Sequence, residues 1–250
     1  MAAFRAALAF LTVVPAGRRG PTEALSASLA YFPWVGLLLG LSLAGLNWIL
    51  GAVFAPGVVD ALLVLALVAI TGALHLDGLM DSCDGLFGVR DSERRLEIMK
   101  DSRVGGFGVA GAATILILKY AAFGALLGST KSVALILAPV LSRWAIVYAV
   151  VAFPYARPQG LGTAFRPSGR SEFFLASVSA LAMALVLGRI WGLWLVLAAW
   201  LATWLVARMV LTRIPGLTGD VYGAINEVVE VVVLLLAAPL SGLYAGVLSW

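Results

Sequence analysis

The sequence ALLVLALVAITGALHLDGLMDSCDG, residues 61–85, joins a continuous apolar run to a group of three aspartates. The 250-residue chain holds 13 acidic residues, and seven of them lie between positions 77 and 103, together with five basic residues. Elsewhere the chain is largely apolar: 62% of its residues are hydrophobic and 12% are charged, with a mean hydropathy of +1.02. Soluble domains carry about 25% charged residues. The composition therefore indicates a polytopic membrane protein in which one polar region is the first place to look for function.

The apolar segments predict an all-α fold, a membrane helical bundle of about seven transmembrane helices, since roughly 20 apolar residues cross a bilayer. Residues 6–14 are too few to span, so they predict an amphipathic or re-entrant segment, with an extra span or a signal sequence as alternatives. Nothing divides the chain, and we expect one domain, residues 1–250. The predicted spans are 31–54, 59–74, 107–127, 133–153, 173–187, 190–211 and 228–248, the fifth and sixth linked tightly through Gly188-Arg189.

The basic residues predict the orientation of the bundle. With the N-terminus inside, the cytoplasmic segments carry 13 of the 17 lysines and arginines, whereas the opposite loops carry only Lys131 and Arg189. The positive-inside rule expects this asymmetry of a seven-span chain with its N-terminus in and its C-terminus out. The same topology places segments 75–106, 154–172 and 212–227 together as cytoplasmic active-site loops. The net charge of +4 then reports topology, and no nucleic-acid partner is predicted.

Asp77, Asp81 and Asp84 are spaced i, i+4, i+7, which places them within an arc of about 60° on one helix face. Three carboxylates on one face repel one another unless a cation lies between them. Hard oxygen ligands suit Mg²⁺ or Mn²⁺, so the spacing predicts a metal site. A solvated acidic helix end is the alternative. His75 would lie about 160° from Asp77, which leaves it a role as a general base, as a support to the ligands or in a structural contact.

A second motif, KDSRVGGFG at residues 100–108, is expected where the third span begins. Backbone N–H groups at a helix N-terminus, with Gly105 and Gly106 giving close access and Lys100 and Arg103 adding charge, predict a phosphate cradle. Asp101 is a candidate fourth metal ligand. The alternative is a glycine-rich turn beside juxtamembrane positive charges.

Two later segments add candidate residues. Asp220 and Glu227 are again i, i+7, and Glu230 falls inside the seventh predicted span, where carboxylates are costly and usually functional. A structural contact between helices is the alternative for these acids. Arg157 and Arg166 lie beside glycines and suit phosphate contacts, although attraction to the membrane surface explains them almost equally well.

Other polar residues predict structural roles. Asp91-Ser92-Glu93 is typical of a helix start, followed by a short surface helix whose Glu93 and Glu97 form solvated pairs with arginines. Arg143, inside the fourth predicted span, is expected to pair with a carboxylate or to line a polar cavity. The single cysteine, Cys83, excludes an internal disulfide. The Gly36-x-x-x-Gly40 pattern suits helix packing within the chain or in a homo-oligomer.

Taken in order, these motifs resemble the cobalamin synthase family, also called adenosylcobinamide-GDP ribazoletransferase. The resemblance rests on HLDG (75–78) with Asp81 and Asp84, LEIMKDSRVG (96–105), Ala156-Arg157 with GLG (160–162), and LTGD (217–220) with Gly223-Ala224, Glu227 and Glu230. It implies a Mg²⁺-dependent enzyme of a bacterial or archaeal cytoplasmic membrane. Its substrates would be adenosylcobinamide-GDP and α-ribazole or its 5′-phosphate, and its products GMP and adenosylcobalamin or its 5′-phosphate.

The candidate residues fit this phosphoryl transfer in three groups. Mg²⁺ ligands are predicted at Asp77, Asp81, Asp84 and Asp101. Phosphate contacts are predicted at Lys100, Arg103, Gly105, Gly106, Arg157 and Arg166. The proton of the attacking hydroxyl is expected to pass to Asp220, Glu227 or an aspartate of the first set. Other hypotheses are a CDP-alcohol phosphotransferase-like enzyme, a membrane prenyltransferase or a cation-coupled transporter.

Overall fold

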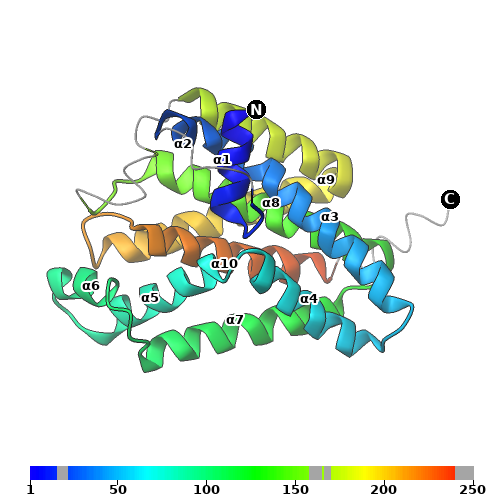
Figure 1. Ribbon diagram of the computed structural model, residues 1–250, viewed down its shortest axis with the longest axis horizontal. Coiled ribbons are helices and arrows are strands. Elements are labelled where there is room, and N and C mark those ends of the chain that lie inside the picture. The colour runs from blue at the N-terminus through cyan, green and yellow to red at the C-terminus, as the bar shows by residue number, and fades with distance from the viewer. Residues whose placement is uncertain (16–21, 158–164, 166–169, 240–250) are drawn as a thin grey trace.

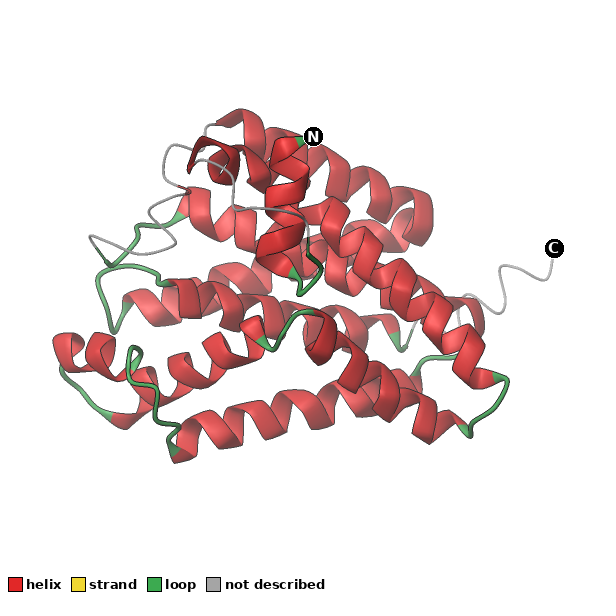
Figure 2. Ribbon diagram, in the orientation of Figure 1, coloured by secondary structure: helices red, strands yellow, loops and turns green. Residues whose placement is uncertain are grey.

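The computed structural model describes residues 1–15, 22–157, 165 and 170–239, and these form an all-α bundle (Figures 1 and 2). The helices are α1 Ala2–Leu11, α2 Thr22–Ser28, the 3₁₀ turn η1 Leu29–Tyr31, α3 Phe32–Gly51, α4 Pro56–Ile70, α5 Leu74–Gly88, α6 Ser92–Ile98, α7 Gly106–Ala125, α8 Gly128–Ala152, α9 Arg170–Leu211 and α10 Gly219–Ala237.

Within the described residues, four helices are long and apolar enough to cross a membrane: Leu25–Gly51, Gly106–Ala125, Gly128–Ala152 and Arg170–Leu211. The helices α4 and α5 meet at 87° and add a fifth candidate only if the bent pair is one span. The all-helical prediction is therefore confirmed, and the count of seven spans and their orientation stay predictions. Helix α1 has ten residues, about half the length that a span needs.

Helix α9 is a hairpin of two helices and not one straight span. Its 42 residues would extend about 63 Å as a single helix, and Arg189 interrupts them with φ 50° and ψ −138°. A side chain at Gly192 would collide with the backbone of Ala184, which a straight helix would keep about 12 Å away. The chain therefore turns back at Arg189, as the predicted link between the fifth and sixth spans requires.

Helix α10 lies at the centre of the bundle, between α8 on one side and α5 and α7 on the other (Figure 1). It begins at Gly219, where the Thr218 hydroxyl accepts a hydrogen bond from the Val221 N–H at 3.3 Å. The expectation of a loop to residue 227 was therefore wrong, while the predicted span from Val228 stays a prediction, because residues 240–248 of it lie outside the described residues. Residues 221–227 are buried in the helix, because α7 and α8 supply cations that neutralise its acidic side chains.

The Gly36-x-x-x-Gly40 pattern packs α3 against α8 within the chain. A side chain at Gly36 would collide with Pro139, and one at Gly40 would collide with Ile136. Small residues at this spacing let two helix backbones touch. The pattern is therefore used inside the bundle.

Candidate active site

Two glycines bring helix α5 close against the start of α10. A Cβ on Gly78 would lie 2.7 Å from the Asp220 carbonyl oxygen, and a Cβ on Gly223 would lie 3.0 Å from that of His75. Any larger side chain would push these backbones apart. The glycines therefore place Asp220 beside the α5 aspartates, although it lies far from them in sequence.

The resulting cluster joins Asp77 and Asp81 of α5 to Asp220 of α10. Asp77 is exposed, and Asp81 and Asp220 are half-buried. The charges of Asp77, Asp220 and Asp84 all act on Asp81, and the nearby Arg157 guanidinium opposes them. The predicted i, i+4, i+7 helix face is confirmed by α5, and tertiary packing adds a carboxylate and a cation to it.

Arg157 is held in the cluster by the backbone and by Asp220. The Leu217 N–H donates to the Pro154 carbonyl at 2.7 Å, and the Ala156 N–H donates to the Leu217 carbonyl at 2.8 Å. The Arg157 Nη2 group then donates to Oδ2 of Asp220 at 2.9 Å. Two of the polar segments expected to be neighbours are thus joined directly.

The ionisation of Asp220 reflects opposing influences. Burial raises the pKa of this carboxyl above its ordinary value, whereas the Arg157 charge and hydrogen bonds from Thr218 and Arg157 lower it. The net shift is upward. Asp220 is therefore a somewhat stronger base than an ordinary aspartate, and Arg157 keeps that shift in check.

Asp84 points into the N-terminus of α7. Its Oδ2 accepts a hydrogen bond from the Gly105 N–H at 2.7 Å and its Oδ1 accepts one from the Gly108 N–H at 2.8 Å. A Cβ on either glycine would collide with this carboxylate. The Gly105 N–H, predicted to contact phosphate, is therefore already engaged by Asp84, and the predicted role of Gly106 stays a prediction.

The loop before α7 carries the other predicted residues on its surface. Asp101 accepts hydrogen bonds from Nε and Nη2 of Arg103, the shorter at 2.6 Å. This pairing lowers the pKa of Asp101 to about 2. Lys100 and Gly106 are exposed. Within the described chain, no three His, Cys, Asp or Glu side chains converge on one metal position, so the four predicted ligands do not form a single group.

The remaining candidates fall elsewhere. Arg166 and the 160–162 glycine segment lie outside the described residues. Glu227 is buried, and its Oε2 accepts a hydrogen bond from the Lys119 Nζ at 2.7 Å. His75 is also buried, and neither ring nitrogen has a hydrogen-bond partner among the described residues. Both side chains therefore face the interior of the bundle.

Two structural predictions are confirmed at the edges of the site. Asp91 caps α6 by accepting a hydrogen bond from the Arg94 N–H at 2.8 Å, and Arg94 pairs with Glu97 on the surface at 2.6 Å. Arg143 pairs with a carboxylate, that of Glu230. Two residues were not predicted from the sequence. One is Lys119, the partner of Glu227, and the other is Arg213, whose guanidinium lies 4.7 Å from the centre of the Phe87 ring. The signal for Lys119 was a lysine inside an apolar span.

The chain matches the family model described as cobalamin-5-phosphate synthase over residues 3–238. It is similar to an adenosylcobinamide-GDP ribazoletransferase of Roseiflexus sp., with 44% identity over 94% of this chain and 89% of that one. The ribazoletransferase of Desulforamulus reducens is 40% identical over 93% of this chain and 94% of that one. The one from Pseudomonas fluorescens is 41% identical over 94% and 98%. No solved structure matches the chain. With its α5 aspartates and Asp220 inside the matched region, the chain belongs to the cobalamin-5-phosphate synthase family.

Proposed function

We propose that this chain joins adenosylcobinamide-GDP to a hydroxyl of α-ribazole or of its 5′-phosphate, with release of GMP. The observation that carries the proposal is the family match across residues 3–238, which includes the whole Asp77–Asp81–Asp220–Arg157 cluster. The product is adenosylcobalamin or its 5′-phosphate, so the enzyme acts in the assembly of the cobalamin nucleotide loop. Membership in this family favours that reaction over CDP-alcohol transfer, prenyl transfer and cation-coupled transport.

Mg²⁺ is the cofactor we propose, held by Asp77 and Asp81 together with substrate phosphates. Carboxylate oxygens suit this hard ion, and Mg²⁺ is commonly bound by one or two carboxylates plus phosphate and water. A site in which no three described side chains converge on one point fits that mode. When bound, Mg²⁺ neutralises charge on the pyrophosphate and helps to orient it. Asp84 and Asp101, engaged by α7 and Arg103, would support the site from its edge.

Phosphoryl transfer depends mainly on positioning and charge neutralisation, because the protein supplies little covalent chemistry. Arg157 enters the cluster from a segment fixed by backbone hydrogen bonds, so its guanidinium can orient the phosphate that is transferred. Lys100 and Arg103 lie on the exposed loop before α7, where they can neutralise charge on the leaving GMP. Arg166 and the Gly106 backbone are further candidates for this role, since the Gly105 N–H already donates to Asp84.

The attacking hydroxyl of α-ribazole must lose a proton as it bonds to phosphorus. Asp220 is our candidate to accept it, because burial raises the pKa of this carboxyl and a more basic carboxylate accepts a proton more readily near neutral pH. Glu227 is less suited, since it lies inside the bundle against Lys119. The bond from phosphorus to the GMP oxygen breaks as the bond to α-ribazole forms.

The test is the release of GMP by purified protein in lipid vesicles supplied with adenosylcobinamide-GDP and α-ribazole. We expect GMP and adenosylcobalamin to be produced in equal amounts when Mg²⁺ is present. Formation of both products should stop when a chelator removes the metal and should resume when Mg²⁺ is restored. Replacing α-ribazole by its 5′-phosphate shows which substrate is preferred. Absence of GMP with Mg²⁺ and Mn²⁺ alike would contradict the proposal.

A multi-pass location in the cytoplasmic membrane, with the N-terminus inside, is also part of the proposal. Four membrane-length apolar helices support it, as does the excess of basic residues in the segments assigned to the cytoplasm. A reporter fused after Trp250 should be active outside the cytoplasm, and one fused after Arg90 should be active inside. The reverse result would contradict the proposed orientation. Cross-linking in membranes would show whether the chain forms a homo-oligomer.

A further inference from the structure

Four charged side chains form a connected network in the interior of the bundle. The Lys119 Nζ of α7 donates to Glu227 at 2.7 Å and to Glu230 at 2.5 Å. Arg143 of α8 donates to the other oxygen of Glu230. The exposed fractions are 1% for Lys119, 6% for Glu227, 1% for Glu230 and 0% for Arg143. Two cations thus balance two anions, and both anions belong to α10.

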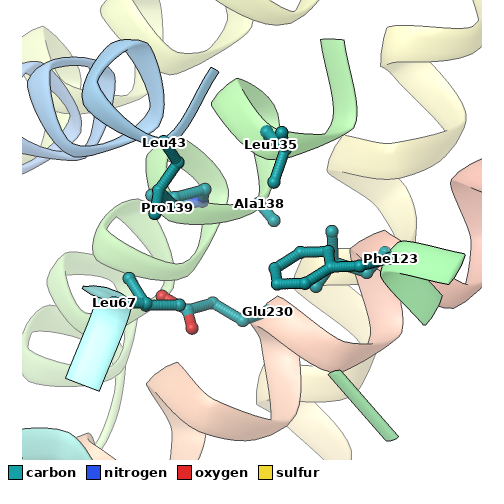
Figure 3. Close-up of a pocket in the computed structure, with 8 residues that line it drawn as sticks. Leu43, Leu67, Phe123, Leu135, Ala138, Pro139 and Glu230 are labelled. Carbon is teal, nitrogen blue, oxygen red and sulfur yellow. The ribbon is translucent and has the colours of Figure 1, made fainter. Parts of the chain in front are cut away.

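The surroundings of Glu230 make an unpaired charge at this position unfavourable. Its side chain borders a small cavity of about 10 Å³ whose other lining residues are apolar, among them Leu67, Phe123 and Leu135 (Figure 3). A space of that size holds about one water molecule at most, which is too little water to solvate an ion. A charge buried without its partner is strongly destabilising in such a setting. The carboxylate is therefore stable only where Lys119 and Arg143 meet it.

This requirement determines how α10 is rotated about its own axis. Asp220 and Glu227 are seven residues apart in α10. Their side chains therefore point in directions that differ by about 20° around the helix, and they lie about 10 Å apart along its axis. A shift of α10 by one residue would turn Glu227 and Glu230 by about 100° away from Lys119 and Arg143. The same shift would turn Asp220 away from the α5 aspartates.

We propose that Lys119, Arg143, Glu227 and Glu230 form a positioning network that sets the rotation of α10 and so holds Asp220 against Asp77 and Asp81. The inference rests on the proposed function, since it explains how Asp220 reaches its working position. It assigns Glu227 a positioning role in place of the proton-accepting role considered from the sequence. The network acts through the helix and touches no substrate.

The bundle contains a matched control. Lys131 of α8 donates to the Asp60 carboxylate of α4 at 2.5 Å, and Asp60 is 2% exposed. This pair also lies between helices, with Asp60 buried and Lys131 half-buried, but it does not involve α10. Its loss should affect the stability of the fold and leave the placement of Asp220 unchanged.

The kinetic experiment compares the Glu227→Gln variant with the Asp60→Asn variant in vesicles, at a temperature where both are folded. Glu227→Gln should lower kcat by about 10- to 100-fold, as expected for a small misplacement of a reacting group, with little change in KM. Asp60→Asn should keep the parental kcat and lose only thermal stability. Glu227→Asp, which keeps the charge, should recover part of the lost kcat.

Coupling to Asp220 separates positioning from a general loss of stability. In an Asp220→Asn background, Glu227→Gln should change kcat by less than about threefold, because groups that act as a unit are not additive. Independent, multiplicative losses would overturn the proposal. So would a full kcat in folded Glu227→Gln protein, or an equal loss of kcat in Asp60→Asn.

A second measurement needs no turnover, so it distinguishes failure of this inference from failure of the proposed reaction. In a Cys83→Ser background, the Asp77→Cys and Asp220→Cys substitutions provide a pair for oxidative cross-linking between α5 and α10. Cross-linking should be efficient with the network intact and several-fold lower with Glu227→Gln, whereas Asp60→Asn should leave it unchanged. Equal cross-linking in all three proteins would overturn the positioning role even if GMP release is observed.

Discussion

Arg157 donates a hydrogen bond from Nη2 to Oδ2 of Asp220 at 2.9 Å, and this contact joins residues that lie 63 positions apart in the chain. The same carboxylate oxygen accepts a hydrogen bond from the Thr218 hydroxyl at 3.2 Å. The side chain of Arg157 is 15% exposed and that of Asp220 is 21% exposed. The pair is therefore well shielded but remains close enough to the surface for a bound substrate to meet it.

Removal of the Arg157 charge should move the acid limb of the pH–rate profile. Burial already raises the pKa of Asp220, and Arg157 lowers it, so Arg157→Met should raise that pKa further. Activity needs ionised Asp220 if it accepts the proton, and the acid limb of kcat/KM should therefore shift to higher pH. Arg157→Lys should shift it less. The same substitution at exposed Arg90, Arg90→Met, is the control and should leave the acid limb unchanged. An unchanged acid limb in Arg157→Met would show that Asp220 does not accept the proton.

Loss of either Asp77 or Asp81 of α5 should remove most Mg²⁺-dependent activity. Asp77→Asn and Asp81→Asn should each lower kcat/KM by more than about 100-fold, since even residues that only support metal ligands are worth 10–100-fold. Their apparent Mg²⁺ requirement should rise. Asp91→Asn, in the cap of α6, is the matched control because asparagine caps helices as well as aspartate. Full turnover by both site variants would exclude this metal site.

Asp84 should contribute chiefly to stability, because its carboxylate binds the N-terminus of α7. Asp84→Ala should cost about 1–3 kcal/mol, the range for leaving shielded donors unpaired. Asp84→Asn, which keeps one acceptor, should cost less. Thermal unfolding in detergent measures both, with the exposed Glu93→Ala as control. An unchanged unfolding temperature with lost activity would support instead the ligand role predicted from the sequence.

The turn inside α9 should respond to changes at Arg189 and Gly192. Arg189 adopts φ 50°, a region that favours glycine, so Arg189→Gly should stabilise the protein by about 1 kcal/mol. Gly192→Leu should destabilise it, since a Cβ there collides with the Ala184 backbone. Gly45→Leu is the control, because nothing lies within 4 Å of its Cβ position. A Gly192→Leu protein as stable as the Gly45→Leu protein would argue against the hairpin.

The local features of this chain were predictable because they depend on neighbours within a few residues. Apolar length predicted the helices that became α3, α7 and α8, and the spacing of Asp77, Asp81 and Asp84 predicted one face of α5. The Asp91 cap followed from the residue types at one helix start. Arg143 was expected to pair with a carboxylate or to line a polar cavity, because an unpaired charge is costly inside a span. The four ordered motifs were sufficient to indicate the family.

The sequence by itself determined helices α3, α7 and α8, the acidic face and the family, since periodicity and residue type are properties of short segments. Only the tertiary structure decided which partner each charge meets, because those partners come from distant helices. It directed Asp84 to the start of α7, brought Asp220 to Arg157 and paired Lys119 with Glu227 and Glu230. These contacts explain why α10 begins nine residues before the span expected from hydropathy. The acidic side chains of α10 are neutralised by cations from other parts of the chain, and a hydropathy average over neighbouring residues does not take such distant cations into account.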